Sequence, residues 1–499
     1  MSSIHEQAMN YVYQQVLQRL MSYFTRAERI ALQLLIQRLI VAAGGIERIG
    51  EFKVMVAHGG GKDSSYTLAF LRAAQLSIAG RSPATFNLRV ATLRHSGVTA
   101  TVMHNVHRSY SALFVYDDPR VELLMVDNKH VRPFNHRLPM SELNRDINRR
   151  NLLMSGHLTA GDGRATFCNG CYLSMADFYE RASAWDKGVD ALVSGESPRE
   201  QKQYMTWLLR ATEKPERVWA GGRALEFDEA VKTCHELGLD YYRELYGEAL
   251  VEPEGPAISR SSRATAPMLV SVYDLVGRDL EERWPLLTEF LGFQFDDLAF
   301  HFSESDCANP LLMAHMRGLQ AQYVRGLSYE GGIGEYLQLA AAMMRRKHMP
   351  ARLVEQAMGS YDSSEKVLDR RALASAYAQE AFGLSEVQLT CLLFAPFVNR
   401  GHGLEAFLRS CHPGMLVALP DLYKALSGQG VSEQIWQWLS EVSGLTPTLL
   451  GDLYTRAQVD FSGVSSLIAR VRASDPDKRR IDIVNPDNGE VFKEVLSGR

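Results

Sequence analysis

A glycine triplet between an apolar segment and a helical segment is the feature that most limits how this chain can fold. Residues 52–57 are mostly apolar and are typical of a buried strand, and residues 64–75 have the composition of a helix. A strand that turns directly into a helix through glycines needs backbone conformations that only glycine adopts freely. The residues at this turn are Gly59, Gly60, Gly61, Lys62, Asp63, Ser64 and Ser65.

The chemistry of this turn is that of a phosphate site. Glycines let the backbone approach a ligand closely, and the N–H groups and dipole at the start of a helix favour anions. Ser64 adds a hydroxyl and Lys62 a positive charge. The spacing differs from that of the Walker loop, which has four residues between its glycines. The alternative is a strand–helix turn that binds nothing.

Strand and helix patterns alternate around the glycine turn. Strands are predicted at residues 52–57, 87–93, 121–126, 191–193 and 268–272, with helices at 64–75 and 102–115 among them. This alternation predicts an α/β fold with a doubly wound parallel sheet and helices on both faces.

The chain divides into four segments by pattern. Residues 1–50 have helical spacing and are expected to form an N-terminal helical segment, and residues 51–278 hold the predicted sheet. Residues 279–475 show leucine-rich and alanine-rich amphipathic runs and predict a large helical domain. Residues 476–499 predict a β-hairpin tail with Asn488-Gly489 at its turn.

Composition excludes several classes of protein. Of the 499 residues, 46% are hydrophobic and 22% charged, as in ordinary globular chains, and the net charge of −4 argues against a general affinity for nucleic acid. Residues 1–15 lack the apolar core of a secretory signal, and apolar runs such as 389–398 are too short to span a bilayer. We therefore expect a cytoplasmic protein that does not enter membranes.

The six cysteines indicate thiols or metal ligands, because a disulfide framework is not expected in a cytoplasmic chain of this length. Cys168 and Cys171 form a CxxC turn, which can hold a metal ion or cluster or form a redox disulfide. Cys307 lies in a polar, loop-like stretch. The remaining three lie in helical patterns and are expected to be packed thiols, namely Cys234, Cys391 and Cys411.

The glycine turn resembles the PP-loop, Ser-Gly-Gly-x-Asp-Ser, of the N-type ATP pyrophosphatases, with Gly59 where that family has Ser. The resemblance implies an adenine nucleotide alpha hydrolase-like fold that splits ATP between the α and β phosphates and transfers AMP to a substrate. Asp63 is then expected to help hold Mg²⁺, although helix capping explains an Asp there equally well. Arg94, after the second strand, is a candidate contact of the nucleotide, as is His95.

The order of the cysteines resembles that in PP-loop sulfurtransferases similar to tRNA 2-thiocytidine synthetase. In those relatives, three cysteines hold a [4Fe–4S] cluster with one open iron, which implies Cys168, Cys171 and Cys307 as ligands here. Gly195 follows the fourth predicted strand, and Glu196 stands where the relatives have His. A zinc site completed by His or Asp is the alternative. Arg199 and Lys202 could bind pyrophosphate or form a solvated helix start.

The expected function is ATP-dependent adenylation with pyrophosphate release, followed by sulfur transfer aided by the cysteine-bound metal. A PP-loop ligase that forms a C–N bond beside a structural zinc is one alternative, and a non-catalytic nucleotide-binding regulatory protein is the other. The expected partners are ATP, a small-molecule or protein acceptor in preference to tRNA, and a sulfur donor, with a homodimer left open.

Overall fold

The computed structural model describes residues 3–196, 198–212, 227–247, 266–276, 280–296, 309–346, 349–463, 465–473 and 479–496. Cys307 lies outside these residues, and nothing is described of the Cys171 side chain. The centre of the molecule is one mostly parallel sheet, and its strands are β1 (Lys53–Ala57), β2 (Asn87–Arg94), β3 (Val121–Asp127), β4 (His130–Pro133), β5 (Ala191–Ser194) and β6 (Met268–Ser271).

The six strands lie in the order β4-β3-β2-β1-β5-β6. β1 pairs in parallel with β2 on one side and with β5 on the other, so the strand order reverses between β1 and β5. β4 is antiparallel to β3 and forms one edge. The sequence patterns predicted a wholly parallel sheet and missed β4, because a four-residue strand with His130 at its start and Pro133 at its end has no apolar alternation.

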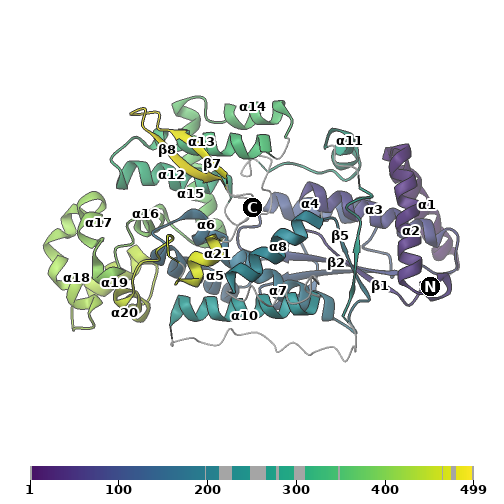
Figure 1. Cartoon of the computed structure of the whole chain (residues 1–499), viewed down its shortest axis with the longest axis horizontal. Coiled ribbons are helices and arrows are strands. Elements are labelled where there is room, and N and C mark those ends of the chain that lie inside the picture. Colours follow the sequence, from purple (N-terminus) through teal and green to yellow (C-terminus); the bar gives the residue numbers. More distant parts are fainter. Residues whose placement is uncertain are drawn as a thin grey trace.

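Helices cover both faces of this sheet (Figure 1). The helices of the N-terminal half are α1 (Ser3–Tyr23), α2 (Arg26–Ala42), α3 (Lys62–Ala79), α4 (Ala100–Ala112), α5 (Glu142–Leu158), α6 (Gly163–Phe167), α7 (Asn169–Ala184), α8 (Pro198–Ala211) and α10 (Phe227–Tyr246). Val54 and Val56 of β1 join the core formed with α1–α4, whereas Met55 joins Phe178 of α7 in a separate core. This period of two is that of a strand buried on both faces.

The described residues from 280 to 473 contain helices and no strand, as the leucine-rich pattern predicted. These helices are α11 (Leu280–Pro285), α12 (Pro310–Leu319), α13 (Tyr329–Arg346), α14 (Ala351–Gly359), α15 (Ser364–Phe382), α16 (Glu386–Phe394), α17 (Leu404–Cys411), α18 (Leu419–Leu426), α19 (Glu433–Ser443), α20 (Pro447–Thr455) and α21 (Leu467–Ala473). One hydrophobic cluster joins Leu153 and Tyr241 with Leu312, Leu392 and Leu450. Helices on both sides of residue 279 therefore share a core.

The C-terminal segment forms a two-stranded antiparallel hairpin of β7 (Arg479–Val484) and β8 (Val491–Leu496), where the sequence predicted one. Asn485 at the turn donates a hydrogen bond to the buried Glu335 of α13. Asp487 accepts from both the backbone N–H and the hydroxyl of Ser328, at 2.7 Å each. The turn is therefore held against α13 by polar contacts as well as by the strands.

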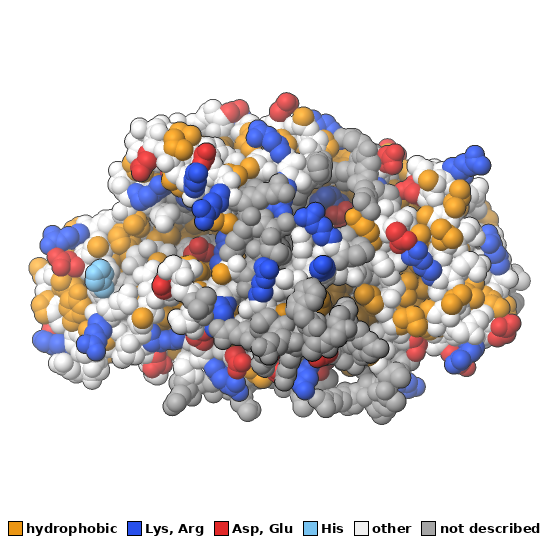
Figure 2. Space-filling view, viewed as in Figure 1, with side chains coloured by type: hydrophobic (Ala, Val, Ile, Leu, Met, Phe, Trp, Pro, Cys, Tyr) orange, Lys and Arg blue, Asp and Glu red, His pale blue; other side chains and the backbone are white. Residues whose placement is uncertain are grey.

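Within the described part of the chain, no helix is long and apolar enough to cross a membrane. On the face shown in Figure 2, acidic and basic side chains are interspersed at both ends of the molecule. Apolar side chains are also exposed on α1 and α2, among them Tyr11, Ile30, Leu34 and Val41.

A buried ion pair holds α3 against the connection between α4 and β3. Arg72 of α3 lies 2.8 Å from the carboxylate of Asp118, and both side chains are fully buried. Arg72 also donates to the carbonyls of Leu113 and Phe114, at 3.2 Å each. Burial opposes ionisation of Asp118, but the Arg120 hydrogen bonds and the Arg72 charge hold the pKa of that carboxyl below its ordinary value. The pair fixes the helix that carries the glycine turn.

We expect Asp118→Ala to lower the free energy of unfolding by about 3–5 kcal/mol, because it leaves the Arg72 guanidinium buried without its counter-ion. Urea unfolding followed by circular dichroism measures this. Asp362→Ala is the matched control: its partner Lys366 is also 2.8 Å away, but both side chains are exposed, and the cost should stay below about 1 kcal/mol. Equal losses in the free energy of unfolding for the two variants would contradict the conclusion that the Arg72–Asp118 pair is buried.

Candidate functional site

The glycine turn connects β1 to α3 at the carboxyl end of the central strand. Gly60 has a φ of +75°, which disfavours any residue with a side chain. A Cβ atom at Gly60 would lie 2.8 Å from the carbonyl oxygen of Val102 and 2.9 Å from the Val106 side chain. Gly60 therefore allows the turn to pack directly on α4, and any larger residue would push the two apart.

Gly59 and Gly61 differ from Gly60 in what they face. A Cβ at Gly59 would meet nothing within 4 Å, so this residue borders open space. Gly61 is the N-cap of α3, and no side chain caps that helix. The hydroxyls of Ser64 and Ser65 instead donate back to the Gly61 carbonyl, at 3.1 and 2.8 Å. The first-turn N–H groups of α3 thus lack a side-chain cap, as an anion site requires.

The loop after β5 packs against α3 close to the glycine turn. A Cβ at Gly195 would lie 2.8 Å from the Thr67 hydroxyl, so the backbone after β5 packs closely on α3. Arg199 and Lys202 follow on the first turns of α8 with exposed side chains. The loops after β1 and β5 therefore adjoin at the point where the strand order reverses, which is where open α/β sheets bind their ligands.

Asp63 is engaged by an arginine that the sequence analysis did not single out. Arg283 of α11 lies 2.9 Å from the Asp63 carboxylate, and its guanidinium stacks over the Tyr66 ring at 5.0 Å. The Asp63 side chain is 73% exposed, whereas that of Arg283 is 10% exposed. The pair brings a positive charge beside the glycine turn from a residue 220 positions away. Nothing local in the sequence marks Arg283 for this role.

His58 is a second residue at the turn that the sequence analysis missed. It is buried, with Nε2 3.2 Å from the Ser65 hydroxyl, and its ring packs against Tyr110. Burial lowers its pKa to about 3, so the ring is neutral at physiological pH. His58 therefore positions the first turn of α3 and carries no charge to the site.

Arg94 ends β2, where the sequence placed it, and its side chain is engaged within the protein. Its guanidinium is paired with both oxygens of Asp127, at 2.6 Å each, and it is buried. Arg132 contacts the same carboxylate. This arrangement ties the ends of β2 and β3 together and occupies the groups that were predicted to touch a nucleotide. His95 accepts a hydrogen bond from the Gly97 N–H at 3.2 Å and borders a cavity.

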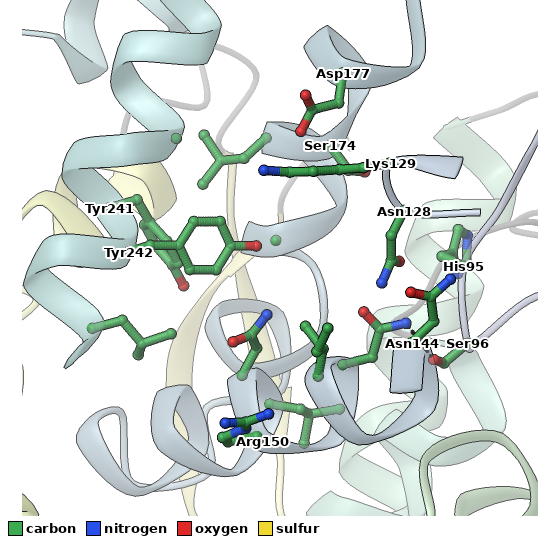
Figure 3. A pocket seen from close by; sticks show the side chains of 18 of the residues that line it. His95, Ser96, Asn128, Lys129, Asn144, Arg150, Ser174, Asp177, Tyr241 and Tyr242 are labelled. Atoms are coloured by element: carbon green, nitrogen blue, oxygen red, sulfur yellow. Dashed lines mark hydrogen bonds between the residues drawn. The ribbon is translucent and has the colours of Figure 1, made fainter. Parts of the chain in front are cut away.

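That cavity, of about 460 Å³, lies at the carboxyl ends of β2 and β3 (Figure 3). Its walls come from the loop after β2, the β3–β4 turn, and helices α5, α7 and α10. Residues of the C-terminal helical region complete it, namely Phe382 and Leu449. The sequence patterns did not predict this site, because its residues are individually ordinary and only the fold brings them together.

The CxxC turn lies on the wall of the same cavity. Gly170, between the two cysteines, lines it, and a Cβ there would lie 3.8 Å from the Tyr242 hydroxyl. Cys168 is the N-cap of α7 and is only 4% exposed. Because Cys307 and the Cys171 side chain lie outside the described residues, the shared three-cysteine centre stays a prediction. Cys234 and Cys391 are buried, and burial raises both thiol pKa values, as expected of packed thiols.

One other group has the residue types of a metal site. The ligand atoms of Asp177, Glu180 and His235 lie within 4.8 Å of one another on α7 and α10. Arg181 approaches the Asp177 carboxylate at 3.7 Å, and the Lys129 ammonium interacts with the same carboxylate. These two cations already compensate the negative charge that would attract a metal ion.

No protein-family model matches this chain, and neither a curated protein nor a solved structure shows significant similarity to it. The features that bear on function are therefore the glycine turn and the cavity. Trp207 of α8 is buried, and its indole N–H donates to the Val471 carbonyl at 2.9 Å.

The buried His58 predicts a pH dependence of stability. An unfolded histidine titrates near pH 6.5, so between about 6.5 and 3 the unfolded chain binds a proton that the folded chain excludes. Stability from this residue is complete above about pH 6.5 and is lost as the pH falls. We expect His58→Gln to reduce the acid-induced loss by up to about 1.4 kcal/mol per pH unit.

Urea unfolding of the two proteins at several values between pH 7 and pH 5 measures this difference. His130→Gln is the matched control, because His130 is exposed in β4, and this variant should follow the wild type. Parallel stability curves for His58→Gln and the wild type would show that His58 is not buried in its neutral form.

Proposed function

We propose that this chain is an ATP pyrophosphatase of the PP-loop type, which binds ATP at the glycine turn and transfers AMP to an acceptor. The observation that carries the proposal is the position of the turn. The sequence Gly-Gly-Lys-Asp-Ser that resembles the PP-loop begins at Gly60, directly after the central strand and beside the reversal of strand order. That reversal is where open α/β sheets bind their ligands.

The local geometry supports binding of the β and γ phosphates. Gly59 borders open space, and the uncapped N–H groups of α3 offer donors to an anion. Lys62 begins the helix, and Arg283 lies beside it through its contact with Asp63. These positive groups and donors would stabilise pyrophosphate as it leaves, which is the largest charge that develops in the reaction.

The proposed first step transfers the adenylyl group. An acceptor oxygen attacks the α-phosphorus, a new P–O bond forms, and the bond between the α-phosphorus and the bridging oxygen breaks. Pyrophosphate leaves with the electron pair of that bond. Mg²⁺, when bound, would supply positive charge at the phosphate oxygens, and Asp63 is the residue that would help to hold it, in competition with Arg283 for the same carboxylate.

The proposed second step replaces AMP by a sulfur nucleophile. The support is the CxxC turn at the start of α7, which borders the cavity through Gly170. A [4Fe–4S] cluster or a zinc ion, when bound, would be held by Cys168 together with the two other predicted ligands, Cys171 and Cys307. An amine nucleophile at the same adenylate would make the chain a ligase that forms a C–N bond. A nucleotide-binding regulatory protein would bind ATP without releasing pyrophosphate.

Two substitutions of Gly59 test the ATP site, because a Cβ atom added here would meet no other atom within 4 Å. We expect Gly59→Val to fill the space meant for phosphate and to weaken ATP binding at least about tenfold, or about 1.4 kcal/mol. Gly59→Ser places the family's hydroxyl at this position and should leave binding equal or tighter. Calorimetric titration with Mg²⁺-ATP measures both.

An unchanged affinity of Gly59→Val for Mg²⁺-ATP would contradict the proposed ATP site. Release of pyrophosphate on addition of candidate acceptors then separates an enzyme from a regulatory protein. The opposite effects expected of valine and serine at one position also exclude a general loss of folding as the cause.

The cysteine prediction has a separate test in protein purified without oxygen. We expect about four iron atoms and four sulfides per chain if the cluster is present, and one zinc if the alternative holds. Serine at Cys168, Cys171 or Cys307 should remove the metal. Cys411→Ser is the control, because Cys411 is a half-buried thiol of α17. If the wild-type protein contains no metal, both the iron–sulfur cluster and the zinc site are contradicted.

A further inference from the structure

The cavity at the ends of β2 and β3 has the size and enclosure of a small-molecule site. Its volume of about 460 Å³ lies in the range of ligand pockets in proteins. His95 and Ser96, which follow β2, form the side nearest to β1, and β1 carries the glycine turn. Because adjacent strands lie about 4.8 Å apart, a ligand here would be a neighbour of a nucleotide on that turn.

The β3–β4 turn places two polar side chains at this cavity. Asp127 and His130 are paired across the two strands, so Asn128 and Lys129 form the tip between them. Asn128 has a φ of +49°, a conformation that Asn tolerates better than most residues. In Figure 3 the Lys129 side chain extends across the cavity, and the Asn128 amide points into it. The turn thus lets both side chains reach a ligand.

The charges on the cavity wall leave an excess of positive charge. Lys129 and Arg150 are cationic and Asp177 is anionic, so the formal sum is 2 − 1 = +1. Asp177 also has the Arg181 guanidinium at 3.7 Å, which offsets part of its negative charge. Burial lowers the pKa of Lys129, and Asp177 opposes that shift only in part. A ligand with one negative charge would balance the wall.

Three further amides define the floor of the cavity on α5. Asn144 is buried, and Asn148 donates its amide to the Ser96 hydroxyl at 2.9 Å. Asn151 accepts with its oxygen from the Tyr246 hydroxyl. The side-chain oxygen of Asn148 is therefore available to accept a hydrogen bond from a ligand. The side-chain NH₂ of Asn151 is available to donate one.

The rest of the wall is apolar or aromatic. It includes Phe167, Leu173, Leu239, Tyr242, Leu245 and Phe382. Such a surface favours a ligand with a ring or a branched hydrocarbon body, and polar groups at a few positions would fix its orientation.

We propose that this cavity binds the acceptor as a small organic acid, with one carboxylate beside Lys129 and an apolar or aromatic body against α7 and α10. That the bound acid is the acceptor of AMP rests on the proposed function. That the cavity binds an organic acid does not.

Three probes of one shape and different charge test the inference on the full chain without ATP. These are 2-naphthoate, 2-naphthamide and 2-naphthamidine, whose binding is measured by ligand-observed NMR titration. We expect the anion to bind at least tenfold more tightly than the neutral amide, and the cation to bind most weakly. Lys129→Met should remove the preference for the anion, and Lys129→Arg should keep it.

Lys366→Met is the matched control, because Lys366 is an exposed lysine of α15 outside this cavity. Equal or tighter binding of the amide or the amidine would overturn the inference, as would a preference for the anion that survives in Lys129→Met. Circular dichroism confirms that each variant is folded. If naphthoate binds as expected but ATP does not, the proposed function fails alone; if ATP binds but the probes show no preference for the anion, this inference fails alone.

Discussion

The close packing of the glycine turn on α4 is the constraint on which the site depends. Gly60 lies against the Val102 carbonyl with no room for a side chain, and Gly195 lies equally close to α3. These two contacts bring the loops after β1 and β5 together at the reversal of strand order. The buried pair of Arg72 and Asp118 then holds α3 in place from its far side. This packing leaves backbone groups at the start of α3, which is what the proposed phosphate site requires.

The helical region takes part in the site instead of standing apart from it. Phe382 and Leu449 line the cavity, and the Tyr377 hydroxyl of α15 donates to the Gly97 carbonyl in the loop after β2, at 2.8 Å. A sheet whose ligands bind at its carboxyl edge needs something to exclude water from that edge. Here α15 and α20 contribute to that cover, so the helical region shapes the cavity that we propose as the acceptor site.

How far the sequence predicted this site depends on how local each signal is. The glycine turn could be recognised because strand, glycines and helix start lie within 14 residues, and β1, β2, β3 and β5 because their apolar runs are buried on both faces. β4 was missed because it is a short edge strand. Arg283 and Lys129 were missed because a lone arginine or lysine is usually a surface residue. Only the fold shows that Arg283 faces Asp63.

The shared core of the two halves has a consequence for synthesis of the chain. The core around α1–α4 uses residues between 13 and 293, so it can form once the ribosome has released the first part of the protein. The second core joins residues from 152 to 471 and must wait for nearly the whole chain. We therefore expect the glycine turn to be assembled early during translation and the neighbouring cavity to close last. During that interval, the apolar sides of α5 and α10 that later join the second core would be exposed to solvent.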